Sequence, residues 1–350
     1  MSERKIIVGI THGDINGIGY EVIIKSLSDP RITEILTPIV YGSSKVASYH
    51  RKALNIENFS FNQIRNASEA HTKRANIINC TNEELKVDPG KSTPEAGKAS
   101  FDALQRATSD LKKGDIDVLV TAPINKDNIQ SKDFNFPGHT EYLQDKFGVS
   151  NALMFLVSDI MRVGVVTGHI PISQVSENIK THKILEKLRI MNKSLLEDFG
   201  IRRPKIAVLG LNPHSGDNGL IGKEEKDEII PAIKVARDEK IMAMGPYPSD
   251  GFFGSETFRK FDAILAMYHD QGLIPFKALV FENGVNFTAG LPIVRTSPAH
   301  GTAYDLVDKN IASPDSFLKA LFMACDIFQK RKEFHKLVAN PLEMQDHSNL

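Results

Sequence analysis

Three histidines occur in loops that directly follow apolar runs of the sequence. His169 follows "VGVVTG", His214 follows "IAVLGLNP", and His269 follows "AILAMY". Imidazole nitrogens bind divalent transition metals, and three of them leave coordination positions open for a substrate or a water molecule. The pattern therefore predicts that the three histidines share one divalent cation. The alternative is that each histidine caps its own loop or makes a local hydrogen bond.

A second group of residues has the chemistry of anion binding. His139 and Thr140 lie in "FPGHTEYL", where a helix is expected to begin, and Lys277, Asn286 and Arg295 lie in a later stretch rich in glycine and proline. Arginine offers a planar fork of N–H donors that matches phosphate and carboxylate. These donors would bind such an anion if they converge. Alternatively, Thr140 is a simple helix cap and the charges are solvated on a β-hairpin.

The loop "GDINGIGYE" (residues 13–21) lies between an expected strand and an expected helix. Backbone N–H groups of a glycine loop can bind phosphate at a helix N-terminus. The spacing of its glycines does not match the G-x-G-x-x-G dinucleotide fingerprint. A tight turn with close packing is an equally good explanation.

Short apolar runs alternate with longer stretches of helical period, which predicts an α/β fold with a mostly parallel sheet. Ligands of open α/β sheets bind beyond the carboxyl ends of the strands, and polar loops follow five of the expected strands here. We therefore expect these five loops to converge on one cleft. The expected strands span residues 5–11, 38–41, 117–121, 152–158, 162–167, 205–210, 263–268 and 277–281, and the expected helices span 19–27, 94–113, 140–147, 172–199, 223–239 and 316–329.

The composition narrows the class of protein and of partner. A chain of 350 residues exceeds the size at which one core usually stops growing, so two domains are expected. Lys+Arg and Asp+Glu both number 43, so no global field favours nucleic acid or an anionic membrane. The two cysteines, Cys80 and Cys325, argue against a disulfide framework or a thiolate zinc site. We expect a cytoplasmic protein that binds neither nucleic acid nor membrane.

Eight stretches together resemble one family, 4-hydroxythreonine-4-phosphate dehydrogenase of pyridoxal phosphate (vitamin B6) biosynthesis, over nearly the whole chain. The run "GLNPH…G" followed by "AMYHDQGL" is the most specific part of this resemblance. The chain departs from the usual pattern at Ile15, Asn16 and Tyr20 in the first loop and at Ala299 before His300. The stretches are "GDINGIGYE", "TAPINK", "GHTEYL", "TGHIP", "GLNPHSGDNG", "MYHDQGLIPFK", "GVNFTAGLPIVRTS" and "HGTAYDL".

The resemblance implies a fold like that of isocitrate and isopropylmalate dehydrogenases, with two α/β/α domains around a cleft. We assign residues 1–135 and 300–350 to the first domain and 136–299 to the second. It also implies a homodimer whose active site lies at the subunit interface, with the histidine of "YHDQG" donated by the other subunit. The implied metal ligands are His169, His214 and His269, and the implied substrate contacts are His139, Thr140, Lys277, Asn286 and Arg295.

The implied reaction is a metal-dependent oxidation of a small phosphorylated hydroxy acid with NAD or NADP. The substrate would be 4-phosphooxy-L-threonine, and the β-keto acid formed would lose CO₂ to give 3-amino-2-oxopropyl phosphate. Lys126 and Asp250 are candidates for proton transfer or polar positioning. The metal would be Zn²⁺, Mg²⁺, Mn²⁺ or Co²⁺, and three imidazoles favour the softer ions over Mg²⁺.

Three other interpretations remain open at this point. The first is a sister dehydrogenase for another four-carbon acid phosphate, such as threonate or erythronate 4-phosphate, because exchanging an amine for a hydroxyl alters few pocket contacts. The second is a three-histidine metallohydrolase that uses metal-bound hydroxide. The third, a phosphate-binding module without catalysis, leaves the three histidine loops unexplained.

Overall fold

The computed structural model describes residues 4–81, 84–280 and 283–340. Its strands are β1 (Ile6–Thr11), β2 (Leu36–Gly42), β3 (Asn62–Ile64), β4 (Asn76–Asn79), β5 (Val118–Thr121), β6 (Leu153–Val157), β7 (Arg162–Thr167), β8 (Lys205–Leu209), β9 (Met242–Tyr247), β10 (Ala263–Tyr268), β11 (Val285–Ala289) and β12 (Arg295–Pro298). Its α-helices are α1 (Gly19–Leu27), α2 (Pro30–Ile35), α3 (Ser44–Ala53), α4 (Pro94–Lys113), α5 (His139–Phe147), α6 (Val175–Asn178), α7 (Thr181–Glu197), α8 (Ile230–Asp238), α9 (Ser249–Gly254), α10 (His269–Leu279) and α11 (Asp315–Val338).

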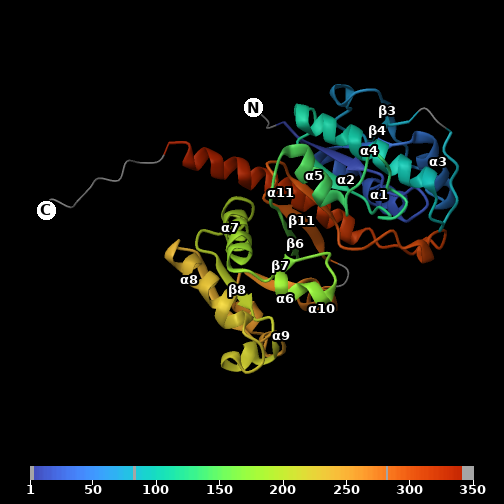
Figure 1. Ribbon diagram of the computed structural model, residues 1–350. Helices are drawn as coiled ribbons and strands as arrows, with labels where there is room; N and C mark the ends of the chain where they lie inside the picture. The colour runs from blue at the N-terminus through green and yellow to red at the C-terminus, as the bar shows by residue number, and fades with distance from the viewer. Residues whose placement is uncertain (1–3, 82–83, 281–282, 341–350) are drawn as a thin grey trace.

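The strands form one mixed sheet in the order β3-β4-β2-β1-β5-β12-β11-β6-β7-β10-β8-β9. Neighbouring strands are parallel except at three consecutive steps, β12–β11, β11–β6 and β6–β7. Because three reversals separate β5 from β7, these two strands run in opposite directions. Figure 1 shows β11 and β6 between one half of the molecule, with α1 to α5, and the other half, with α6 to α10. The predicted α/β fold with a mostly parallel sheet is confirmed.

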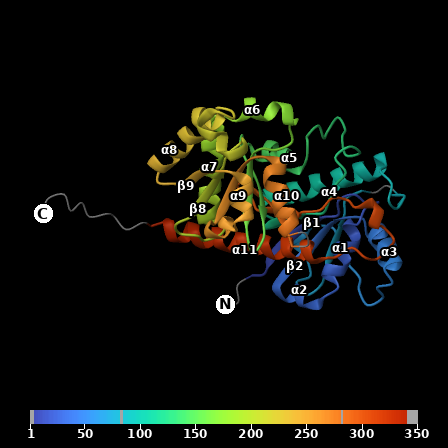
Figure 2. The same ribbon diagram turned by 90° about the horizontal axis from the view of Figure 1, so that it is seen from below.

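Helices pack on both faces of this sheet. Leu188 of α7 and Phe317 of α11 belong to one apolar cluster, whereas Leu104 of α4 belongs to a second and Phe276 of α10 to a third. The long helix α11 contacts β12, β5 and β11 as well as α7, so it packs against both halves, and Figure 2 shows it running across the molecule. Within the described ranges, no helix has the length and apolar composition needed to cross a lipid bilayer.

Two expected elements are wrong. The strand expected at 277–281 is instead the end of helix α10 as far as Leu279, and Phe281 lies outside the described residues. Gly272 lies inside α10, where an added Cβ would approach Val163 Cγ1 to 2.7 Å. The helix expected at 172–199 is interrupted before Thr181, whose backbone N–H donates to Glu228 and starts α7 there.

The expected domain boundary at residue 136 falls within closely packed aromatic residues. Tyr142 of α5 stacks on Phe134, with ring centroids 5.5 Å apart, and packs edge-on against Phe101 of α4. Strand β12 pairs with β5, so the chain returns to the first half of the sheet before residue 300. The division into two domains with these boundaries stays a prediction.

Candidate active site

The main candidate site is a cavity of about 300 Å³ that lies against the face of the sheet. Met154 and Leu156, from the middle of β6, line it together with residues that follow β5 and β12. The expected convergence of five loops is confirmed for three of them, since segments that follow β5, β7 and β10 line this cavity, whereas the loop after β1 does not and His214, after β8, lines a neighbouring cavity. Eight of the candidate residues line this cavity: Lys126, His139, Thr140, His169, His269, Lys277, Asn286 and Arg295.

Arg295 is the most deeply buried charge in the cavity, with 3% of its surface exposed. Its guanidinium donates to Thr121 Oγ1 at 2.6 and 3.1 Å, to Thr288 Oγ1 at 3.3 Å and to His139 Nδ1 at 3.1 Å. Among the described residues it forms no ion pair with a carboxylate. Burial lowers the pKa of Arg295 to about 10, so the side chain remains positive at neutral pH. A buried cation whose hydrogen-bond partners are all neutral attracts an anion.

His139 completes this anion-binding end of the cavity. Because its Nδ1 accepts from Arg295, its proton lies on Nε2, which is buried without a hydrogen-bond partner in the part of the chain that the structure describes. Burial, and then the charges of Arg295 and Lys126, hold the pKa of His139 well below 6.5, so the ring is neutral. Asn286 Oδ1 and His300 Nε2 are also buried without a partner among those residues. Since buried polar groups are normally paired, these atoms fit an anionic, hydroxylated ligand.

Two of the three histidines meet at the other end of the cavity. The rings of His169 and His269 are 5.7 Å apart between centroids. The Lys126 ammonium lies 3.3 Å from His169 Nε2, to which it donates, and burial together with Lys126 lowers the pKa of His169. His269 Nδ1 donates to Asp270 at 2.7 Å, which leaves the lone pair of Nε2 available. A carboxylate that fixes the tautomer in this way is the usual companion of a metal-binding histidine.

His214 and Asp250 lie apart from this pair, in a neighbouring cavity of about 580 Å³ that Tyr268 and Asp270 also line. The three histidines nevertheless follow adjacent strands, since β10 lies between β7 and β8. Across residues 4–81, 84–280 and 283–340, no group of three or more His, Cys, Asp or Glu side chains could hold a metal ion. The single chain therefore does not bring the three imidazoles together, and their sharing of a cation stays a prediction.

The donor set nevertheless fits a divalent transition metal. His169 presents a ring nitrogen that already faces a cation, the Lys126 ammonium, and the tautomer of His269 directs its free lone pair away from Asp270. Neutral imidazoles are the form that binds metal. Within the single chain, His169 and His269 are neighbours, and His214 lies in the next cavity.

The loop that carries His214 has an unusual backbone. Residues 214–218 all adopt left-handed angles, with φ between 43° and 78°, and only Gly216 among them lacks a Cβ. The left-handed conformation costs about 1–2 kcal/mol for each residue other than glycine. Strain of this size persists only where the surroundings impose it, and it clusters at functional sites. The sequence signal for the left-handed turn was the glycine, asparagine and aspartate content of "SGDNG", since these residues tolerate left-handed angles best.

Three residues that the sequence analysis missed hydrogen-bond to Arg295 or to the segments that carry the candidate residues. Thr121 and Thr288 accept hydrogen bonds from Arg295. Gln271 donates to Gly210 O at 2.6 Å and to Ser249 Oγ at 2.7 Å. It thereby connects the first turn of α10, which begins at His269, to the segments that carry His214 and Asp250. The available signal was that all three lie in quoted stretches, Thr121 in "TAPINK", Thr288 in "GVNFTAGLPIVRTS" and Gln271 in "MYHDQGLIPFK".

The glycine loop of residues 13–21 does not line the cavity. Its Asp14 is fully buried, and a Cβ added to Gly13 would come within 2.3 Å of the Pro123 carbonyl. The loop therefore packs beneath the segment that carries Lys126, which favours the close-packing explanation over phosphate binding.

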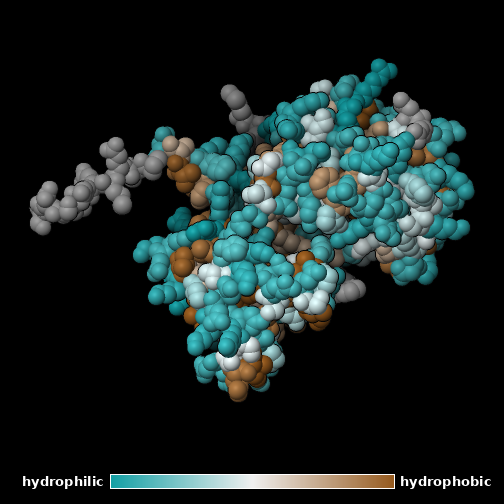
Figure 3. All heavy atoms as spheres, viewed as in Figure 1, coloured by the Kyte–Doolittle hydropathy of each residue, from teal (hydrophilic) through white to brown (hydrophobic). Residues whose placement is uncertain are grey.

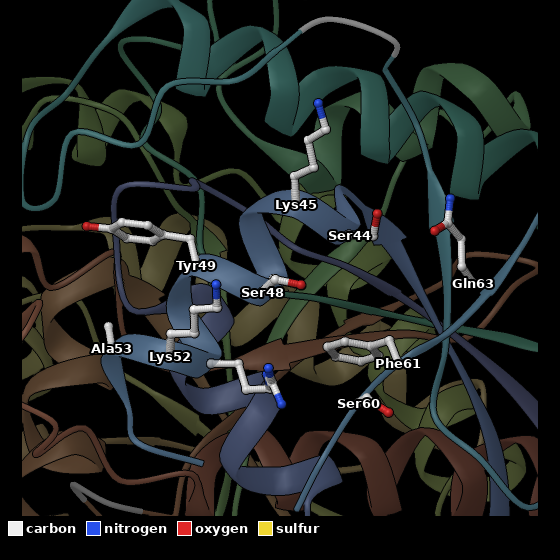
Figure 4. Close-up of a pocket in the computed structure, with 11 residues that line it drawn as sticks. Ser44, Lys45, Ser48, Tyr49, Lys52, Ala53, Ser60, Phe61 and Gln63 are labelled. Carbon is white, nitrogen blue, oxygen red and sulfur yellow. The ribbon is translucent and has the colours of Figure 1, made fainter. Parts of the chain in front are cut away.

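A larger cavity of about 820 Å³ lies elsewhere, beside α3 (Figure 4). It is lined by serines, Tyr49 and three cations, of which Lys45 pairs with Glu84 and Arg51 donates to backbone carbonyls. Among the described residues, none of the candidate site residues lines it. Size alone therefore does not identify the site.

Comparison with known proteins adds independent findings. The family described as "Pyridoxal phosphate biosynthetic protein PdxA" matches residues 34–324. A 4-hydroxythreonine-4-phosphate dehydrogenase from Bacteroides thetaiotaomicron is 55% identical over 347 residues, which cover 99% of this chain and 95% of that protein. A putative D-threonate 4-phosphate dehydrogenase from Oceanobacillus iheyensis is 38% identical, over 93% of this chain and 98% of its own length.

Solved structures agree with this sequence similarity. The crystal structure of a 4-hydroxythreonine-4-phosphate dehydrogenase from Klebsiella pneumoniae superposes with a TM-score of 0.79 at 34% identity, over 94% of this chain and 100% of that one. An isocitrate dehydrogenase from Methylococcus capsulatus superposes with a TM-score of 0.51 at 10% identity, over 95% of this chain and 88% of that one. The second similarity concerns the fold alone, and it confirms the predicted isocitrate dehydrogenase-like architecture.

Proposed function

Because the chain belongs to the family of the pyridoxal phosphate biosynthetic protein PdxA, a family of dehydrogenases, we propose that it oxidises 4-phosphooxy-L-threonine with NAD or NADP. The product is a β-keto acid that loses CO₂ to give 3-amino-2-oxopropyl phosphate. The observation that carries the proposal is the buried, positively charged Arg295 beside the free Nε2–H of His139, in a cavity that three further imidazoles, those of His169, His269 and His300, also line.

The substrate phosphate and carboxylate are held by the anion-binding end of the cavity. Arg295 and His139 supply N–H donors from a dry environment, where charge-assisted hydrogen bonds are strong. Lys277 adds a second cation and Thr140 a hydroxyl. Asn286 Oδ1, which lacks a partner among the described residues, accepts a hydrogen bond from the substrate amine or hydroxyl.

His169, His214 and His269 are the proposed ligands of one divalent cation. When bound, such a cation lowers the pKa of a coordinated hydroxyl and stabilises developing negative charge. Hydride transfer belongs to the nicotinamide cofactor. Lys126, within reach of both His169 and the cavity, is the proposed group for moving the hydroxyl proton, and Asp250 is a polar positioning group beside His214.

In the proposed homodimer the histidine of "YHDQG" reaches the site of the other subunit, so that the three imidazoles meet at the subunit interface instead of within the single chain. Apolar side chains are exposed around the histidine loops, among them Ile172 (71%), Leu220 (81%) and Ile274 (64%). Figure 3 also shows apolar side chains at the lower end of the half of the molecule that carries α9. Clustered exposed apolar residues are characteristic of protein–protein interfaces.

The decisive experiment is turnover with a panel of 4-phosphooxy-L-threonine, D-threonate 4-phosphate and D-erythronate 4-phosphate. Each substrate is paired with NAD or NADP and with Zn²⁺, Mg²⁺, Mn²⁺ or Co²⁺, and absorbance at 340 nm and CO₂ release are followed. We expect the highest kcat/KM for 4-phosphooxy-L-threonine, with release of CO₂.

The second candidate, a threonate or erythronate 4-phosphate dehydrogenase, is favoured by the similarity to the Oceanobacillus iheyensis protein. A higher kcat/KM for either of those phosphates would replace the proposal with it. Hydrolysis without any reduction of nicotinamide would point to the metallohydrolase instead.

A further inference from the structure

We propose that Glu225, assisted by Glu224, is a positioning residue that holds the His214 loop in the geometry needed for metal binding. The inference rests on the proposed function, since it assigns a role toward the proposed metal ligand His214. Neither carboxylate lines the substrate cavity, and the motifs that indicated the site do not include them.

Glu225 is the first residue of the short π-helix η4 (Glu225–Ile229) and is 3% exposed. Its Oε1 accepts from the backbone N–H groups of Leu211 and Asn212, both at 2.7 Å, and its Oε2 accepts from Asn212 Nδ2 at 2.9 Å. No ion pair with a cation is formed by Glu225 among the described residues. A buried carboxylate whose donors come from the two residues just before Pro213 and His214 fixes the entry into that loop.

The same carboxylate fills the inside of the left-handed turn. A Cβ added to Gly216 would lie 2.6 Å from Glu225 Oε2, and one added to Gly210 would lie 3.2 Å from Glu225 Oε1. The left-handed turn therefore packs directly against this side chain at Gly216, and the strand end before it does so at Gly210. Since residues with a Cβ avoid left-handed angles, the turn needs such an external support to persist.

Glu224 extends the support to the second histidine loop. Its carboxylate accepts from Asn212 Nδ2 at 2.8 Å and from the hydroxyl of Ser176, which lies in α6 a few residues after His169. Asn212 thus donates to both carboxylates. The chain Ser176–Glu224–Asn212–Glu225 links the segments that carry His169 and His214, so the two proposed ligands are held relative to each other.

The test is Co²⁺ binding to the full-length protein after removal of metal with a chelator, followed by visible absorbance and titration calorimetry. In Glu225→Gln, an amide N–H₂ replaces an acceptor that faces Asn212 Nδ2. We expect roughly 10- to 100-fold weaker Co²⁺ binding, as for other residues that orient metal ligands, and faster amide exchange at residues 211–219. Glu224→Gln should weaken binding less.

The matched control is Glu228→Gln, which alters a carboxylate on the same short helix that binds Thr181 instead of the histidine loop. It should keep wild-type Co²⁺ affinity. If Glu225→Gln fails to fold, Gly222→Ala perturbs the same contacts from outside, because its Cβ would lie 2.4 Å from Asn212 Nδ2. It should weaken Co²⁺ binding in the same way.

His214→Ala separates the two hypotheses. If His214→Ala loses Co²⁺ while folded Glu225→Gln and Gly222→Ala bind it like wild type, the positioning role is overturned and the proposed function stands. If His214→Ala itself binds Co²⁺ like wild type, the metal assignment is overturned and the positioning role falls with it. Loss of binding in His214→Ala and Glu225→Gln, but not in Glu228→Gln, supports both.

Discussion

The two ends of the cavity are built in different ways. At the anion-binding end, Arg295 is 3% exposed and donates to the side chains of Thr121, Thr288 and His139. At the histidine end, the side chain of His269 is 35% exposed and His214 lies in a separate cavity on a left-handed loop. A buried charge needs dry, fixed surroundings to interact strongly with an anion, and a single folded chain provides them. Histidines that are to bind a cation at a subunit interface, as proposed for His169, His214 and His269, have to stay accessible.

The largest expected effect concerns the histidine end of the cavity. His214→Ala should lose bound divalent metal, and turnover should fall to background while the fold survives, because His214 is exposed and makes no core contact. Metal content after dialysis and the rate of nicotinamide reduction measure this. The control is His182→Ala, an exposed histidine on α7, which should behave like wild type. A His214→Ala protein that keeps both metal and activity would remove His214 from the site.

The pH dependence of the free energy of unfolding should distinguish a buried imidazole, that of His12, from an exposed one. Burial lowers the pKa of His12 from 6.5 to about 4 in the folded protein, whereas the unfolded chain takes up this proton near pH 6.5. The stabilising contribution of neutral His12 is thus complete above pH 6.5 and is lost as the pH falls to about 4, by roughly 3 kcal/mol.

Urea unfolding between pH 7 and 4 measures this loss. His12→Gln keeps a donor for the carbonyl of Ala99 but cannot titrate, so its free energy of unfolding should depend less steeply on pH below 6.5. His182→Gln should keep the wild-type slope. Equal slopes for all three proteins would mean that His12 does not take part.

The next prediction concerns the anion-binding end of the cavity. Arg295→Ala removes an ionic hydrogen bond to the phosphorylated substrate, which contributes about 1.5–3 kcal/mol of binding free energy. KM should rise by the corresponding factor, with a smaller change in kcat. Arg162→Ala is the matched control, because Arg162 packs on Phe199 and donates to the Asp262 carbonyl away from the cavity. Steady-state kinetics decide the matter, and an unchanged KM would exclude Arg295 from the substrate site.

The smallest expected effect concerns the neutral partners of Arg295. Thr288→Val removes the hydroxyl that accepts from the guanidinium at 3.3 Å and keeps the shape of the side chain. The free energy of substrate binding should weaken by about 0.5–1.5 kcal/mol, and KM should rise accordingly. Thr296→Val removes a hydroxyl that instead binds the Ala320 carbonyl in α11, and it should lower the melting temperature without changing KM. Identical kinetic effects of both changes would show that Thr288 acts only through stability.

Local patterns predicted most of the elements and most of the cavity lining. Apolar runs identified β1, β5, β7, β8 and β10, since a buried strand needs apolar side chains on both faces. They misjudged residues 277–279, where a short apolar stretch reads equally well as strand or helix. They also missed the left-handed turn at His214, because the contacts that support it come from Glu225 in the following helix.

The residue types alone determined what chemistry the chain offers: imidazoles for a cation, and a guanidinium, an ammonium and amides for an anion. Tertiary structure decided which of them act together. The order of the strands in the sheet brings segments that follow β5, β7 and β10 around one cavity, so that Arg295 is enclosed and Lys126 faces His169. Strand direction and the solvation of a charge depend on contacts between residues far apart in sequence, and no local pattern contains that information.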